Sequence, residues 1–145
     1  MTDTYRILVT GARDWSDEDA LAEALLAARD YPLRTIRTNR ARKVTLVHGA
    51  CPHGADAIAD RWAKQWGWEV EQHPAEWTAA GKAAGFKRNA TMVAAGADIC
   101  LAFIKPCRAV KPRCKNQGPH DSHGTAHCAK LARAAGILVV EVREQ

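Results

Sequence analysis

The chain opens on Arg6-Ile7-Leu8-Val9-Thr10-Gly11, a β-type run that stops at a glycine. From Ser16, which can cap a helix, apolar residues then recur at helical spacing as far as Arg29, and Pro32 ends the segment. A short strand that passes through a glycine into a helix is the first half of a βαβ unit, whose next strand lies parallel to the first. This opening therefore predicts an α/β fold with a parallel sheet.

The alternation of strand and helix continues through the rest of the chain. Further strands are predicted at 43–48, 68–72, 98–104 and 137–142, and further helices at about 54–65, 86–95 and 124–135. The nearly all-apolar strand at 98–104 is typical of a parallel sheet that is covered on both faces. We predict one Rossmann-like three-layer domain over residues 1–145, with about five mainly parallel strands and helices on both faces.

Composition supports an ordinary globular protein. The 145 residues are 47% hydrophobic and 26% charged, which argues against intrinsic disorder. We expect no contact with a membrane, because no apolar run approaches the roughly 20 residues of a membrane-spanning helix. The polar start of the chain lacks the features of a signal peptide, so we expect a cytoplasmic protein.

The net charge of +5 comes from two local patches. Residues 34–43 and 105–115 hold ten of the 21 basic residues and no acid, whereas the remainder has 11 basic and 16 acidic residues. Such patches can meet phosphate groups, including those of a nucleic acid. The alternative interpretation is a pair of solvated loops.

Three glycine-bearing segments follow predicted strands, at 10–15, 48–56 and 122–125. Because the carboxyl ends of parallel strands meet at one edge of the sheet, we expect these segments to form one rim there. Glycine allows close approach to an anion, and helix N-termini offer free N–H groups. With the helix at 86–95, the rim gives these candidate ligand-binding residues: Gly11, Ala12, Arg13, Gly49, Gly54, Asp56, Arg88, Asn89, Gly124 and Thr125.

The familiar nucleotide signatures are absent from the sequence. Gly49 and Gly54 have the spacing of a Walker A loop, but Ala55-Asp56 stands where Lys-Ser/Thr is required. No Gly-x-Gly-x-x-Gly follows the first strand. The sequence therefore predicts neither ATP hydrolysis nor an NAD(P)-dependent dehydrogenase.

Several side chains in or near this rim have both a functional and a structural interpretation. Asp56 could hold ribose hydroxyls or act as a base, or it could simply stabilise the dipole of a helix. Arg88 is suited to bidentate binding of phosphate, or it could be an exposed helical arginine. Trp15 and Trp77 could stack on a base, although core packing is the commoner fate of tryptophan.

The motifs together resemble the YspA/YpsA-related branch of the SLOG superfamily. They run in order over most of the chain and comprise Ile7–Trp15, Val47-His48-Gly49, Gly54-Ala55-Asp56, Pro74–Trp77, Gly81–Gly85, Arg88-Asn89, Met92, Ala102-Phe103, and Gly124-Thr125 with His127. The resemblance implies a Rossmann-like fold that binds nucleotides or nucleotide-derived molecules, as a sensor or sequestering module, and a homo-oligomer.

Relatives in the superfamily imply two alternatives. The first is a nucleotide N-glycosidase similar to the LOG phosphoribohydrolases, with Asp56 or Glu76 as the candidate acid or base. LOG enzymes carry a glutamate soon after their glycine-threonine loop, whereas here Gly124-Thr125 is followed by no acid before Glu141. The second is a DNA-binding protein similar to DprA, which would use the basic patches.

An insertion at about 105–121 interrupts the alternation of strand and helix. Cys107, Cys114, His120 and His123 supply two thiols and two imidazoles in and beside it, the ligand types that a structural zinc ion prefers. The insertion has few apolar side chains to bury, and a metal could order it instead. Two alternatives are a Cys107–Cys114 redox pair and an unstructured basic loop with incidental cysteines.

Overall fold

Strands and helices alternate in the computed structural model, which describes residues 4–31, 43–76, 83–107 and 123–143. In chain order the elements are β1 (Thr4–Gly11), α1 (Glu18–Arg29), β2 (Lys43–His48), α2 (Ala55–Gln65), β3 (Glu69–Gln72), α4 (Ala84–Ala94), β4 (Ile99–Ile104), α5 (His123–Ala134) and β5 (Leu138–Arg143). Each predicted strand and helix is present, with bounds that differ by one or two residues.

The five strands form one parallel sheet in the order β3-β2-β1-β4-β5. At the centre, Leu8 of β1 lies in register with Val47 of β2 on one side and with Cys100 of β4 on the other. The chain thus builds outward from β1 to one edge, returns, and builds outward to the other edge. The predicted Rossmann-like α/β architecture is confirmed.

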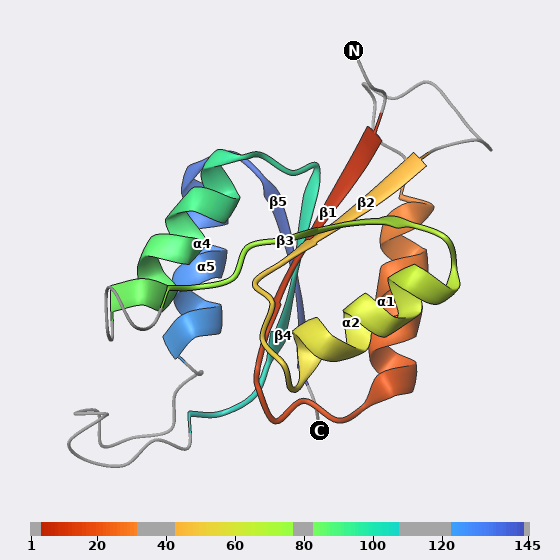
Figure 1. The fold of residues 1–145 in the computed structure, drawn as a ribbon, viewed down its shortest axis with the longest axis horizontal. Coiled ribbons are helices and arrows are strands. Elements are labelled where there is room, and N and C mark those ends of the chain that lie inside the picture. The colour runs from red at the N-terminus through yellow and green to blue at the C-terminus, as the bar shows by residue number, and fades with distance from the viewer. Residues whose placement is uncertain (1–3, 32–42, 77–82, 108–122, 144–145) are drawn as a thin grey trace.

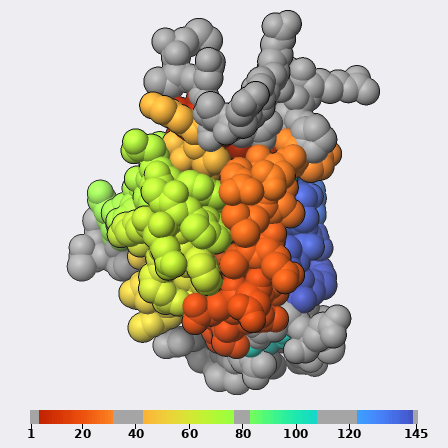
Figure 2. Space-filling view, turned by 90° about the vertical axis from the view of Figure 1, so that its right-hand side faces the viewer, coloured from red at the N-terminus to blue at the C-terminus, as the bar shows by residue number. Residues whose placement is uncertain are grey.

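Helices cover both faces of the sheet (Figure 1). Helices α1 and α2 pack on one face and lie side by side over it, as Figure 2 shows. Helices α4 and α5 pack together on the other face. Each face has its own apolar core: Ile7, Val9 and Phe103 lie in the first, and Leu8, Met92 and Cys128 lie in the second.

The start of α1 corrects one prediction. The cap is Asp17 rather than Ser16: its carboxylate accepts a hydrogen bond from the Ala20 N–H at 3.0 Å. A carboxylate is the better partner here, because its charge also meets the positive end of the helix dipole. Trp15, one of the two candidate stacking tryptophans, is buried and packs edge-on against Phe103 at 5.2 Å between ring centroids.

Parts of three predictions lie outside the described residues. They are the basic patch at 34–43, apart from Lys43, the tryptophan at position 77, and the insertion beyond Cys107. Among the described helices, none is long and apolar enough to cross a membrane.

Candidate functional site

A cavity of about 1230 Å³ opens at the carboxyl edge of the sheet. Strands β1 and β4 are neighbours at the centre of the sheet, but the helices that follow them, α1 and α5, lie on opposite faces. This divergence leaves a crevice beyond the strand ends, which is where open α/β sheets bind ligands. This volume lies above the roughly 300–1,000 Å³ range of most small-molecule sites.

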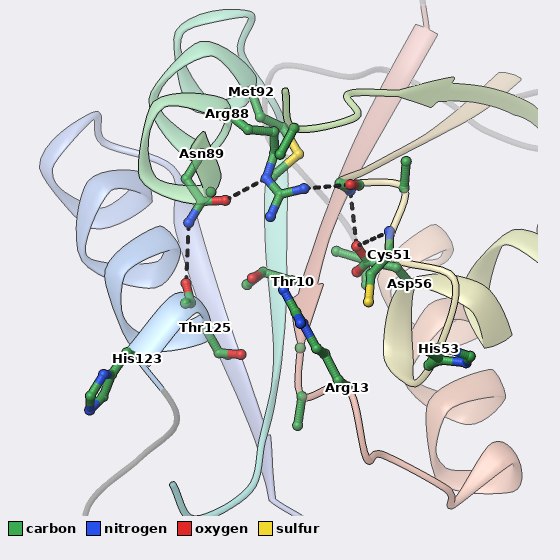
Figure 3. A pocket seen from close by; sticks show the side chains of 18 of the residues that line it. Thr10, Arg13, Cys51, His53, Asp56, Arg88, Asn89, Met92, His123 and Thr125 are labelled. Carbon is green, nitrogen blue, oxygen red and sulfur yellow. Dashed lines mark hydrogen bonds between the residues drawn. The ribbon is translucent and has the colours of Figure 1, made fainter. Parts of the chain in front are cut away.

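Nine of the ten candidate ligand-binding residues line this one cavity, from elements far apart in the sequence (Figure 3). They are Gly11, Ala12, Arg13, Gly49, Asp56, Arg88, Asn89, Gly124 and Thr125. The structure thus brings nine of the predicted residues together around one cavity, and their binding of a ligand stays a prediction. Gly54 is the exception: it does not line the cavity and packs against Ala12 and Arg13 instead.

Gly54 joins the first two loops instead of facing the cavity. Its φ of +74° is in the region that favours glycine, and a Cβ here would lie 2.5 Å from the carbonyl carbon of Arg13. Beside it, the Ala55 N–H donates to the Ala12 carbonyl at 3.2 Å. Gly11 is confined in a similar way, since a Cβ there would meet Phe103 at 2.9 Å. At these two glycines the close neighbour is the protein itself.

Gly124 differs from the other rim glycines. It lies in the first turn of α5, and a Cβ at this position would meet no atom within 4 Å. Of the rim glycines discussed here, it is the one with open space beside it. Packing within the described part of the chain does not demand a glycine there.

Arg88 is one of two arginines that line the cavity, the other being Arg13. The Nε of Arg88 donates to Asn89 Oδ1 at 2.9 Å, and its Nη1 donates to the carbonyls of Gly49 and His73, the latter at 3.5 Å. These bonds hold the guanidinium between α4 and the loop after β2 (Figure 3). Its Nη2 has no hydrogen-bond partner among the described residues, so its N–H groups remain available for an anion.

Asp56 shapes the loop after β2. Its Oδ2 accepts hydrogen bonds from the N–H groups of Gly49 at 3.1 Å and Cys51 at 3.4 Å. The carboxyl group is buried, and its Oδ1 has no partner among the described residues. Burial raises the pKa of Asp56, and the two backbone donors and the charge of Arg88 partly counteract that rise. Asp56 thus holds the loop in shape at the cost of burying a carboxyl group.

His48, at the end of β2, holds the middle of the same turn. Its Nδ1 accepts a hydrogen bond from the Ala50 N–H at 2.9 Å, so its Nε2 carries the proton and donates to Asp60 at 2.9 Å. Ala50 has a φ of +60°, which is uncommon for a residue with a side chain. The Ala50 N–H is bonded to His48, and the N–H groups of the residues before and after it are bonded to Asp56. These bonds hold the conformation in place.

The other candidate catalytic residue lies apart from these groups. Glu76 is exposed and does not line the cavity. Of the four candidate zinc ligands, Cys107 and His123 both line the cavity, with 3.7 Å between Cys107 Sγ and His123 Nε2. Positions 114 and 120 lie outside the described residues. Within the described residues no group of three or more His, Cys, Asp or Glu could hold a metal ion.

Phe86 is a lining residue that the sequence did not single out. It lies seven residues before Val93, which is the spacing of one helix face, so periodicity assigns it to the core. In the structure it is 47% exposed. An aromatic residue next to Gly85, at the start of a helix that leads to Arg88, was the signal available.

Comparison with known proteins identifies the family. Residues 5–79 match the model of the YspA, cpYpsA-related SLOG family, and the chain belongs to that family. It is also 42% identical over 144 residues to the Gene 61 protein of Mycobacterium phage D29, covering 93% of this chain and 94% of that protein. No solved structure matches the chain significantly.

Proposed function

We propose that this protein binds a nucleotide or nucleotide-derived ligand in the cavity, with Arg88 taking the anionic group. The observation that carries the proposal is the Arg88 guanidinium, which is held by three protein acceptors while Nη2 remains available. Membership of a SLOG family supports a nucleotide-type ligand. A pre-positioned guanidinium binds phosphate without first paying the entropy of ordering a long side chain.

The geometry favours binding without turnover, as in a sensor or a sequestering module. A general acid or base must reach the atom with which it exchanges a proton. Asp56 lines the cavity, but its Oδ1 is buried and its Oδ2 is occupied by two backbone donors. Glu76 lies outside the cavity. These positions argue against the N-glycosidase alternative.

Binding of nucleic acid has less support. The two basic patches fall mostly outside the described residues. Lys105, which begins the second patch, pairs with Asp14, with 3.6 Å between its Nζ and the carboxylate Oδ2. Self-association, which the family resemblance implies, likewise stays a prediction.

The ligand itself is the most informative observable. We expect gentle denaturation of protein purified from cells to release a nucleotide-type molecule, which mass spectrometry of the supernatant identifies. The matched control is the Arg88→Ala variant purified in parallel. Equal amounts of the molecule from both proteins would remove Arg88 from the binding site, whereas an intact molecule at one equivalent would argue against hydrolysis.

We also propose a structural zinc ion held by Cys107, Cys114, His120 and His123. The specific support is the approach of Cys107 to His123, which places two of the four proposed ligands together at the edge of the cavity. The expected result is one equivalent of zinc by elemental analysis of protein purified without a metal-binding tag. A Cys107→Ser/Cys114→Ser double variant should lose it, and unchanged zinc in that variant would reject this site.

A further inference from the structure

Phe86, at the start of α4, is an aromatic residue that lines the cavity. Single exposed hydrophobic side chains are ordinary on protein surfaces and do not by themselves indicate a binding site. This one, however, lines the same cavity as Arg88 and is 47% exposed. Its position makes it a candidate contact for an apolar, planar part of the ligand.

The ring is held in place from one side. Phe86 packs against His127 of α5 with 4.2 Å between the ring centroids and 30° between the ring planes. This contact covers one face of the ring, while 47% of the residue stays exposed. A supported ring with an open face is the geometry that aromatic stacking requires.

A chain of hydrogen bonds connects this support to the anion-binding group. Asn89 Oδ1 accepts from Arg88 Nε at 2.9 Å, which turns its amide Nδ2 toward His127 Nδ1 at 3.2 Å and the Gly124 carbonyl at 3.3 Å. His127 Nδ1 is therefore an acceptor. Burial, together with the nearby Lys130, lowers the pKa of His127, in keeping with a neutral ring. Asn89 thus orients both Arg88 and the support beneath Phe86.

We infer that Phe86 is the surface on which the base of a bound nucleotide stacks while Arg88 binds its anionic group. The inference rests on the proposed function of the same cavity and makes it more specific. The ligand class becomes nucleotides with an intact base, as distinct from sugar phosphates. Because every base has a π-face, this contact selects for a base but discriminates little among bases.

Calorimetric titration with AMP tests the inference on the full chain. Phe86→Leu keeps an apolar side chain but removes the ring, and should weaken AMP binding about 5- to 150-fold. Phe86→Trp should retain affinity. Tyr31→Leu is the matched control, because Tyr31 is 42% exposed but does not line the cavity, and it should change nothing.

Two further measurements separate stacking from a loss of structure. Ribose 5-phosphate, used as a competitor, should be bound about equally by the unsubstituted chain and by Phe86→Leu, since it has no base. A 2-aminopurine nucleotide should lose fluorescence on binding the unsubstituted chain, and the quenching should be much weaker with Phe86→Leu.

The outcomes distinguish this inference from the proposed function. Unchanged AMP affinity in Phe86→Leu, or an equal loss for AMP and ribose 5-phosphate, would overturn the stacking role and leave nucleotide binding in place. If the unsubstituted chain bound none of AMP, GMP, CMP and UMP, the proposed function would fail and the inference with it.

Discussion

The two sides of the cavity are built differently. We call loops 10–14 and 49–56 the packed side, because the space beside Gly11 and Gly54 is filled by other parts of the chain. We call the start of α4 as far as Arg88, together with the first turn of α5, the open side. Among the described residues, Arg88 Nη2 has no hydrogen-bond partner, Phe86 is exposed, and Gly124 has space beside it. The packed side fixes the shape of the cavity, and the open side offers the groups that can contact a ligand.

The difference shows what glycine motifs in such loops indicate. A glycine between a strand and a helix is compatible with close approach of an anion, but here two of them allow one loop to approach another. The chemistry proposed for this cavity lies instead on α4, in Arg88 and Phe86. We therefore expect substitutions on the packed side to change stability and substitutions on the open side to change affinity.

Replacing one glycine on each side by alanine gives the largest expected contrast in stability. Gly54→Ala combines a positive φ with a collision against the Ala12 carbonyl, and should lower the free energy of unfolding by about 2–5 kcal/mol. Gly124→Ala meets open space in a helix, and should cost nothing or stabilise the protein by up to about 1 kcal/mol. Urea unfolding of both variants measures the contrast, and similar values would erase the distinction between the two sides.

Asp56 gives a smaller effect on the packed side. Asp56→Ala leaves the N–H groups of Gly49 and Cys51 without their acceptor, and should cost about 1–3 kcal/mol. Asp56→Asn should be close to neutral, since an amide oxygen can accept both bonds and no carboxyl group needs burying. The same unfolding assay compares them. A large loss in Asp56→Asn would show that the charge itself is needed.

The smallest expected effect is a pH dependence on the open side. The pKa of His127 is lowered from 6.5 in the folded protein by burial and Lys130, so the unfolded chain binds the proton more readily. Stability from this group is therefore complete above about pH 6.5, and declines as the pH falls from there through the lowered value. His127→Gln should flatten the slope of unfolding free energy in this window. An unchanged slope would show that His127 does not titrate in this way.

The fold could be predicted almost completely from the sequence. Each strand is a short run bounded by glycine, proline or charged residues, and the apolar 99–104 segment could be buried only within a covered parallel sheet. The errors were local. Ser16 and Asp17 are both good caps, and which of them starts the helix depends on where the chain leaves Trp15, a buried tertiary contact.

The site could be predicted in outline and less well in detail. Parallel strands bring the ends of β1, β2 and β4 to one edge, so the residues of the cavity followed from topology. Sequence does not show which neighbour a glycine approaches, and so Gly54 could not be separated from Gly49. Phe86 was not singled out either, because its apolar spacing to Val93 is the same for a core position as for a cavity-lining one.

The most direct test of the account is the affinity of the Arg88→Ala variant for the nucleotide that mass spectrometry identifies. Arg61→Ala is the control, because Arg61 is exposed and pairs with Glu18, away from the cavity lining. Loss of a charged hydrogen bond predicts about 10- to 150-fold weaker binding in Arg88→Ala, no change in Arg61→Ala, and a folded protein by circular dichroism in both. Equal affinities in the two variants would contradict the central claim that Arg88 binds the ligand.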